Sequence, residues 1–76
     1  MNATQEAQFL RLVRTLCAMS LNEVATRTGV EESRLCRFEL GRIKLPDAQV
    51  DAVESVLRGA AAAHRRRLES AIQRWQ

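Results

Sequence analysis

Residues 20–46 read SLNEVATRTGVEESRLCRFELGRIKLP and contain a dense set of helix start and stop signals. Ser20 and Glu23 have the spacing of a capping box, in which the serine caps a helix and the glutamate reaches back to the serine backbone. Gly29 supplies the left-handed residue that commonly ends a helix. These signals predict a short helix over residues 21–28, followed by a tight glycine turn.

A second short helix is expected directly after this turn, over residues 31–40, with its stop at Gly41. At about 100° per residue, Leu35 and Phe38 point to the same side of that helix, with Glu39 beside them. The opposite side carries Ser33, Arg37 and Leu40. The helix therefore combines a face for a hydrophobic core with a largely polar face that carries a protruding arginine.

Helical periodicity continues on both sides of this pair. A first helix is expected at about residues 4–18, because apolar residues recur there at the spacing of one helix face, at Leu10, Val13 and Cys17. Another is expected at about residues 47–58, where Pro46 and Asp47 suit a helix start. Its inward residues are Val50, Val53 and Leu57.

The last part of the chain, residues 60–76, is also expected to be helical. Gly59 is a weak break, and the sequence leaves open whether it is a hinge or a glycine within one long helix. One continuous apolar stripe follows, made of Leu68, Ala71, Ile72 and Trp75. Two interpretations remain: the stripe folds back on the core of its own domain, or it forms a homodimer interface with Trp75 as an aromatic anchor.

The chain as a whole has the size of one small domain, residues 1–76. It has no strand or hairpin signal, so we expect an all-α fold. The formal net charge is +3 and eleven of the 12 basic residues are arginine, which weakly favours an acidic partner such as nucleic acid. The residues MNATQEAQF give no export signal, and Cys17 and Cys36 are expected to be reduced thiols, so we expect a cytoplasmic protein.

The pattern of residues 8–58 resembles the helix-turn-helix of the lambda-repressor and Cro type, often called the XRE family. The matching residues are Arg14, Ser20, Glu23, Val24, Ala25, Gly29, Val30, Leu35, Phe38, Glu39, Gly41 and Pro46. The resemblance implies a four- to five-helix, lambda-repressor-like DNA-binding domain. The second and third helices would form the helix-turn-helix, and a C-terminal helix would complete the domain.

The resemblance also implies roles for individual residues. Positions 32, 33 and 37 match base-reading positions, positions 42 and 44 match a basic loop that touches phosphates, and Arg14 and Glu39 match an ion pair between the first and third helices. A carboxylate beside a buried stripe needs such a partner on physical grounds as well. The candidate DNA-binding residues, with Arg34 included for its position on the same helix, are Glu32, Ser33, Arg34, Arg37, Arg42 and Lys44.

Two positions depart from the family pattern. Leu21 stands where a phosphate-holding glutamine is common, so that contact is lost unless backbone N–H groups at the helix start replace it. The helix over 31–40 begins with Glu31 and Glu32, which suit the helix dipole but would face polyanionic DNA. Glu32 is either a specificity element that accepts a hydrogen bond from cytosine or a sign that the chain does not bind DNA.

Nothing in the sequence indicates an enzyme, a metal site, a cofactor or a small-molecule ligand. His64 lies outside any cluster with metal-ligand spacing, and no glycine-rich phosphate loop or nucleophile motif is present. No apolar stretch approaches the roughly 20 residues that span a bilayer. The arginines at 65–67 are either a solvated helix face or a DNA clamp, and the solvated face is the commoner arrangement.

Two functions follow from the sequence. The first is a regulator, in particular a repressor from a phage, a mobile element or an autoregulated operon, that binds a palindromic double-stranded DNA operator as a dimer. The second is a protein-binding module, such as an antitoxin or anti-activator, that contacts a larger partner through its C-terminal helix.

Overall fold

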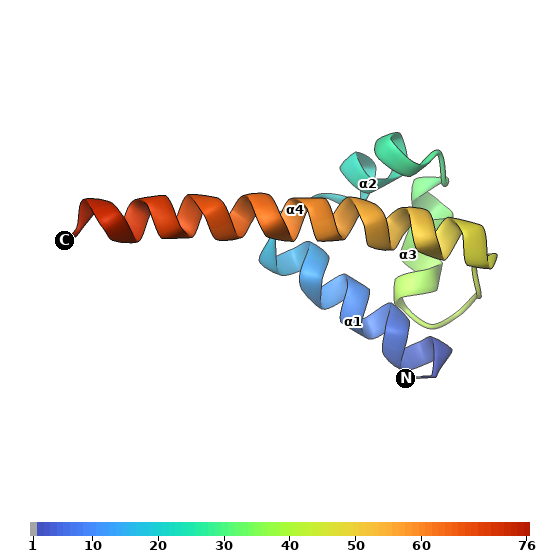
Figure 1. The fold of residues 1–76 in the computed structure, drawn as a ribbon. Helices are drawn as coiled ribbons and strands as arrows, with labels where there is room; N and C mark the ends of the chain where they lie inside the picture. The colour runs from blue at the N-terminus through green and yellow to red at the C-terminus, as the bar shows by residue number, and fades with distance from the viewer. Residues whose placement is uncertain (1) are drawn as a thin grey trace.

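The computed structural model describes residues 2–76, which form four helices. They are α1 (Ala3–Leu16), α2 (Leu21–Thr28), α3 (Glu32–Glu39) and α4 (Asp47–Arg74). Helices α1 and α2 each pack against both α3 and α4 (Figure 1). No strand occurs among the described residues, so the all-α prediction is confirmed.

All four helices, the turn between α2 and α3 and the loop before α4 contribute to one hydrophobic core. Its members are Ala7, Leu10, Met19, Val24, Val30, Leu35, Phe38, Leu45, Val53 and Leu57. The inward residues expected for α3 and α4 are among them, and Val50 packs against the same cluster. Burial of each larger side chain contributes roughly 1.5–3 kcal/mol, which is the main force that holds these short helices together.

Helix α2 begins and ends where its sequence signals predict. The Ser20 hydroxyl accepts a hydrogen bond from the Glu23 backbone N–H at 3.0 Å, and the Ser20 N–H donates to the Glu23 carboxylate at 3.1 Å. Met19 and Val24, on either side of this cap, are both buried. Gly29 ends the helix with a φ of 76°, a left-handed conformation that glycine adopts without steric cost.

Helix α3 follows two residues later and ends in a second left-handed glycine, Gly41, with a φ of 75°. The N–H of Gly41 donates to the Phe38 carbonyl at 3.0 Å and that of Arg42 to the Arg37 carbonyl at 2.9 Å. This is the Schellman pattern, which satisfies carbonyls that would otherwise lack partners at the helix end.

Helix α1 ends two residues earlier than expected, at Leu16 rather than near residue 18. Ala18 takes a left-handed conformation with a φ of 55°, and the N–H of Met19 donates to the Arg14 carbonyl at 3.0 Å. The same type of turn therefore ends α1, although an alanine occupies the position where glycine is usual.

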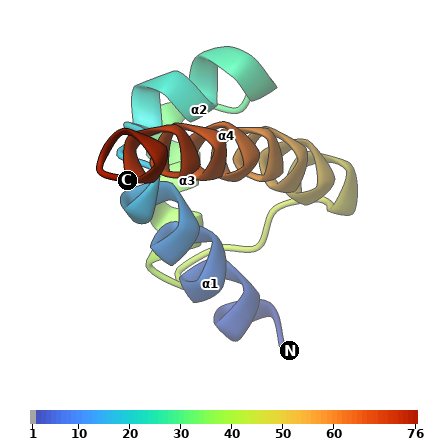
Figure 2. The same ribbon diagram turned by 60° about the vertical axis from the view of Figure 1, so that its left-hand side comes forward.

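Helix α4 is a single helix of 28 residues, so the two helices expected at 47–58 and 60–76 are one. Gly59 lies inside it, and Pro46 precedes its first turn instead of forming part of it. The C-terminal half projects beyond the other three helices (Figures 1 and 2), and the molecule is 46 Å along its longest axis. The C-terminal stripe does not fold back on its own core, because every residue from 65 to 76 is exposed.

Candidate nucleic-acid interface

One face of α3 is free of packing contacts with the core and carries most of the candidate recognition residues. Glu32, Ser33 and Arg37 are exposed there, and Leu40, directly after the helix, is 50% exposed. Leu35 and Phe38 are buried on the opposite face. The Arg37 guanidinium makes one long hydrogen bond, from Nε to the Ser33 carbonyl at 3.4 Å, so most of its donors remain available.

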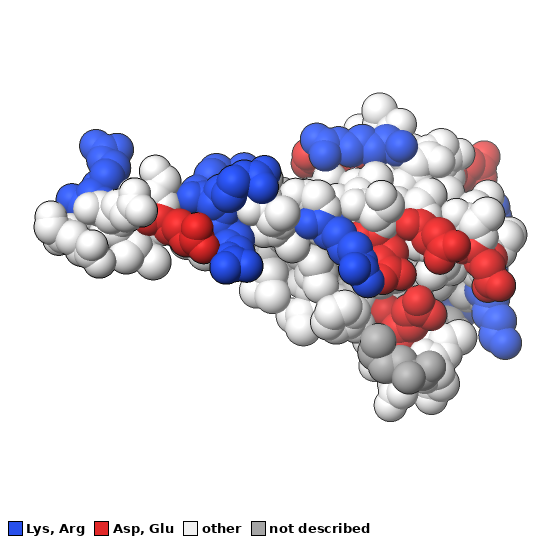
Figure 3. All heavy atoms as spheres, in the orientation of Figure 1, with Lys and Arg blue, Asp and Glu red and all other residues white. Residues whose placement is uncertain are grey.

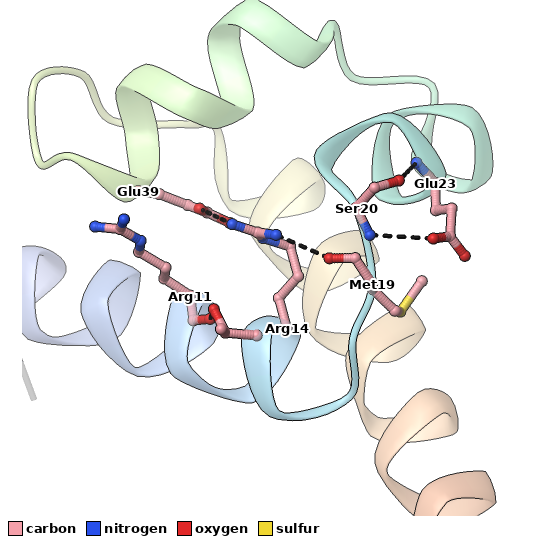
Figure 4. A network of polar contacts seen from close by, with 7 residues as sticks. Arg11, Arg14, Met19, Ser20, Glu23 and Glu39 are labelled. Carbon is pink, nitrogen blue, oxygen red and sulfur yellow. Dashed lines mark hydrogen bonds and ion pairs between the residues drawn. The ribbon is translucent and has the colours of Figure 1, made fainter.

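The ion pair between Arg14 and Glu39 fixes the orientation of α3 against α1. Nε and Nη2 of Arg14 donate to the two carboxylate oxygens of Glu39 at 2.7 and 2.8 Å (Figure 4). Nη1 donates to the Met19 carbonyl at 2.8 Å, so the same guanidinium also holds the segment that leads into α2. The hydrogen bonds with Glu39 raise the pKa of Arg14, although partial burial opposes that change.

Arg34 is less exposed than the sequence indicates and has a hydrogen-bond partner on another helix. It is half-buried, and its Nη1 donates to Oε1 of Gln49 in the first turns of α4 at 3.2 Å. This bond links α3 to α4. A sequence pattern could not reveal it, because the distance between the two side chains depends on how the helices cross. Arg34 therefore lies at the side of the exposed face and has a structural partner.

The loop after α3 presents its two basic residues outward. Arg42 and Lys44 are exposed, whereas Ile43 is half-buried and Leu45 is buried. This alternation ties the loop to the core through its apolar residues. It leaves both basic side chains in solvent, in the loop that follows the C-terminal end of α3.

The acidic start of α3 also has a local partner. The Asn22 side chain of α2 donates to Glu32 across 3.5 Å, at the limit of a hydrogen bond. Glu32 lies in the first turn of α3, where a negative charge is favourable next to the helix dipole. The carboxylate is exposed and near α2, so it lies at the boundary between the two short helices.

Charge is distributed unevenly along the chain. Residues 1–59 contain eight basic and eight acidic residues and are formally neutral, whereas residues 60–76 contain four arginines and one glutamate and carry the whole net charge of +3. Figure 3 shows arginines gathered on the projecting part of α4 and both signs mixed over the rest of that face. The basic candidate residues on α3 and in the loop after it, Arg34, Arg37, Arg42 and Lys44, therefore belong to a part of the chain that has no net charge.

The predicted dimerisation residues all lie on the exposed projection of α4. Leu68 is 51% exposed, Ile72 49% and Trp75 85%, and Ala71 is also exposed. Three further large apolar residues, for which the sequence pattern predicted no role, are exposed on α1: Phe9, Leu12 and Leu16. They could have been recognised from the sequence, because all three fall outside the inward stripe of α1 formed by Leu10, Val13 and Cys17.

The described residues hold no group of three or more His, Cys, Asp or Glu side chains that could bind a metal ion. Across residues 2–76, no helix combines the length and the apolar character that a membrane crossing requires. In comparisons with known proteins, no family model, no curated protein and no solved structure matched this chain.

Proposed function

We propose that this chain is a sequence-specific double-stranded DNA-binding regulator, acting as a repressor, with α2 and α3 as a helix-turn-helix of the lambda-repressor type. The observation that carries the proposal is the exposed polar face of α3, with Ser33 and Arg37 directed to solvent and the helix held from behind by Leu35 and Phe38. A helix with this division of faces can enter a major groove without disturbing its core.

The roles of the individual side chains follow from their chemistry. Arg37 reads a guanine through two parallel hydrogen bonds, Ser33 contacts a neighbouring base, and Glu32 accepts from a cytosine amino group. Arg42 and Lys44 contact phosphates, and Arg34 keeps donors for a phosphate beside its bond to Gln49. One α3 reads too few bases for useful specificity, so the regulator binds a palindromic operator as a dimer through Leu68, Ala71, Ile72 and Trp75.

The test begins with selection of bound duplexes from a randomised double-stranded pool, followed by titration of the selected site. Arg37→Ala should cost about 1–3 kcal/mol and relax specificity at one position per half-site. Lys44→Ala should weaken all sequences more evenly. Arg27→Ala removes the same charge and is the control. Arg27 is not one of the candidate DNA-binding residues, and it lies beside Gly59 and Ala63 of α4. Failure to enrich any sequence at low salt would reject the proposal.

A second candidate is a protein-binding module, such as an antitoxin or anti-activator, that contacts a larger partner through the C-terminal half of α4. The exposed Leu68, Ile72 and Trp75 on a projecting helix favour it, as does the acidic start of α3. Titration of the selected duplex against excess nonspecific DNA separates the two candidates. A module that only binds protein gives no specific complex under these conditions.

A further inference from the structure

An apolar groove lies between α1 and α4, next to the projecting part of α4. It has a volume of about 240 Å³ and an apolar lining of Phe9, Leu10, Val13, Leu57 and Ala61, with Glu54 and Arg58 at its α4 edge. Phe9 forms part of its wall and is 49% exposed. The groove is therefore an open apolar site that no side chain of residues 2–76 fills.

On its α4 side the groove leads into the exposed stripe: Leu57 is buried, Ala61 is half-buried and Leu68 is exposed. Positions 57, 61, 64, 68, 71 and 75 follow one another at alternating steps of four and three residues, the spacing of a coiled-coil seam. The seam starts at Leu57 under α1, passes through Ala61 and ends at Trp75. One molecule therefore carries an apolar groove at one end of the seam and an exposed indole at the other.

We propose that a second copy of this chain lies antiparallel along α4, so that Trp75 of each copy occupies the α1–α4 groove of the other. When Trp75 lies opposite Leu57, Ala71 lies opposite Ala61 and Leu68 lies opposite His64, so all six seam positions are matched. The arrangement is isologous and closes as a dimer with two identical Trp75 contacts. It deepens the dimer of the proposed function, and its formation requires no DNA.

The antiparallel arrangement fills the α1–α4 groove of each copy, which a parallel arrangement would leave empty. In a parallel pair each Trp75 would lie against the Trp75 of the other copy, and both grooves would stay empty. Ala61 and Ala71 meet between the larger residues, which permits the close helix approach that docking of Trp75 requires.

In the proposed dimer, buried area comes from two sources, the docked indoles and the seam. Two indoles account for roughly 300–500 Å² of the roughly 1,200 Å² that a small specific interface buries. The seam between positions 57 and 75 adds about 27 Å of helix–helix contact on each copy. Close to the two-fold axis, Arg65, Arg66 and Arg67 of both copies approach one another, and Arg65 is paired with Glu69 of its own helix at 2.9 Å.

Trp75 is the only tryptophan, so its fluorescence reports directly on the proposed contact. We expect its emission to shift to shorter wavelength as protein concentration rises, in step with dimer formation measured by sedimentation. Phe9→Glu in the groove should raise the dimer dissociation constant roughly tenfold or more and abolish the shift. Leu12→Glu is the matched control: Leu12 is 55% exposed on the same helix and does not line the groove, so both signals should persist.

Cysteine cross-linking tests the direction of the helices independently of the Phe9 variant. In a background in which Cys17 and Cys36 are replaced by alanine, Ala61→Cys and Ala71→Cys are prepared as two separate proteins. The antiparallel register brings position 61 of one copy next to position 71 of the other. Mild oxidation of the mixture should therefore link the two different variants, whereas Ala71→Cys alone should stay unlinked.

Three results would overturn the inference: Ala71→Cys linked to itself, equal loss of the dimer in Phe9→Glu and Leu12→Glu, or a wild-type chain that stays monomeric at all concentrations. The last result would indicate that the exposed stripe of α4 binds a different protein. Because these measurements contain no DNA, a dimer of this form without operator binding would reject the proposed function alone.

Discussion

At the scale of single residues, the ion pair of Arg14 with Glu39 joins α1 to α3, and Arg14 also holds the segment before α2. We expect Glu39→Gln to destabilise the fold by roughly 1.5–3 kcal/mol, since it removes the carboxylate from a half-buried guanidinium. The pair Arg14→Met with Glu39→Leu should recover most of that loss. It should retain a cost of about 1 kcal/mol, because the Met19 carbonyl loses its 2.8 Å donor.

Thermal and denaturant unfolding of the single and double variants measures these terms. Strictly additive losses would contradict the coupling between the two side chains. The contribution of Arg14 should not fade at neutral or moderately alkaline pH. Its pKa is raised in the folded state, so the stabilisation is fully present below the unfolded value and is lost only as pH rises through the raised one.

Ala18 gives a second prediction at the same scale. Its φ of 55° is a left-handed conformation that costs an alanine roughly 1–2 kcal/mol. Ala18→Gly removes this strain but adds freedom to the unfolded chain, so the net effect should be a stabilisation of up to about 1 kcal/mol. Ala62→Gly, at an exposed position inside α4, is the control and should destabilise by about 1 kcal/mol. Equal signs for the two variants in urea titrations would contradict the assignment of strain to residue 18.

At the scale of elements, substitution of Gly29 and of Gly59 by alanine gives a controlled comparison. A Cβ added at either position meets no atom within 4 Å, so packing does not distinguish them. Gly29 has a left-handed φ of 76°, whereas Gly59 lies inside α4. We expect Gly59→Ala to stabilise the fold by about 0.5–1 kcal/mol and Gly29→Ala to destabilise it by roughly 1–2 kcal/mol. Thermal melts measure both, and a loss of stability in Gly59→Ala would contradict a continuous α4.

The elements that could be predicted from the sequence are those with side-chain or glycine signals at their ends. Ser20, Gly29 and Gly41 predicted α2 fully and α3 to within one residue at each end. The end of α1 was misplaced because Ala18 takes the left-handed conformation there, and an alanine in a sequence does not indicate that conformation. The continuity of α4 stayed open because a glycine inside a helix costs only about 1 kcal/mol, which neighbouring alanines and packing can offset.

The candidate site was predictable to a similar extent. The helix period placed Ser33 and Arg37 opposite Leu35 and Phe38, and the structure has the same division of faces. The bond between Arg34 and Gln49 was not predictable, nor was the groove beside Phe9. Both arise where two helices cross, and crossing geometry depends on the whole core instead of on a local pattern.

At the scale of the whole molecule, salt should act in opposite directions on the two proposed associations. DNA binding should weaken as salt rises, because phosphate contacts release counterions. Dimer formation without DNA should strengthen, because the arginines at 65–67 repel their copies near the two-fold axis and salt screens that repulsion. Between about 0.1 M and 1 M the screening length falls from about 10 Å to about 3 Å.

Sedimentation across this range, with fluorescence of Trp75 as a parallel readout, measures the salt dependence of dimer formation. Replacement of Arg66 and Arg67 by glutamine should reduce that dependence and tighten the dimer at low salt. Weaker dimer formation at high salt in the wild-type chain would show that attraction between charges, and not the apolar seam, holds the copies together.

The unbroken course of α4 through Gly59 also limits how the length of this chain can change in evolution. One residue added between 59 and 75 would turn Trp75 by about 100° around the helix, away from the side of the groove. Seven added residues, close to two full turns, would return it to nearly the same side. They would also move the two α3 helices of the proposed dimer about 10 Å further apart. Insertions and deletions in this stretch should therefore come in steps of seven, each accompanied by a new operator spacing.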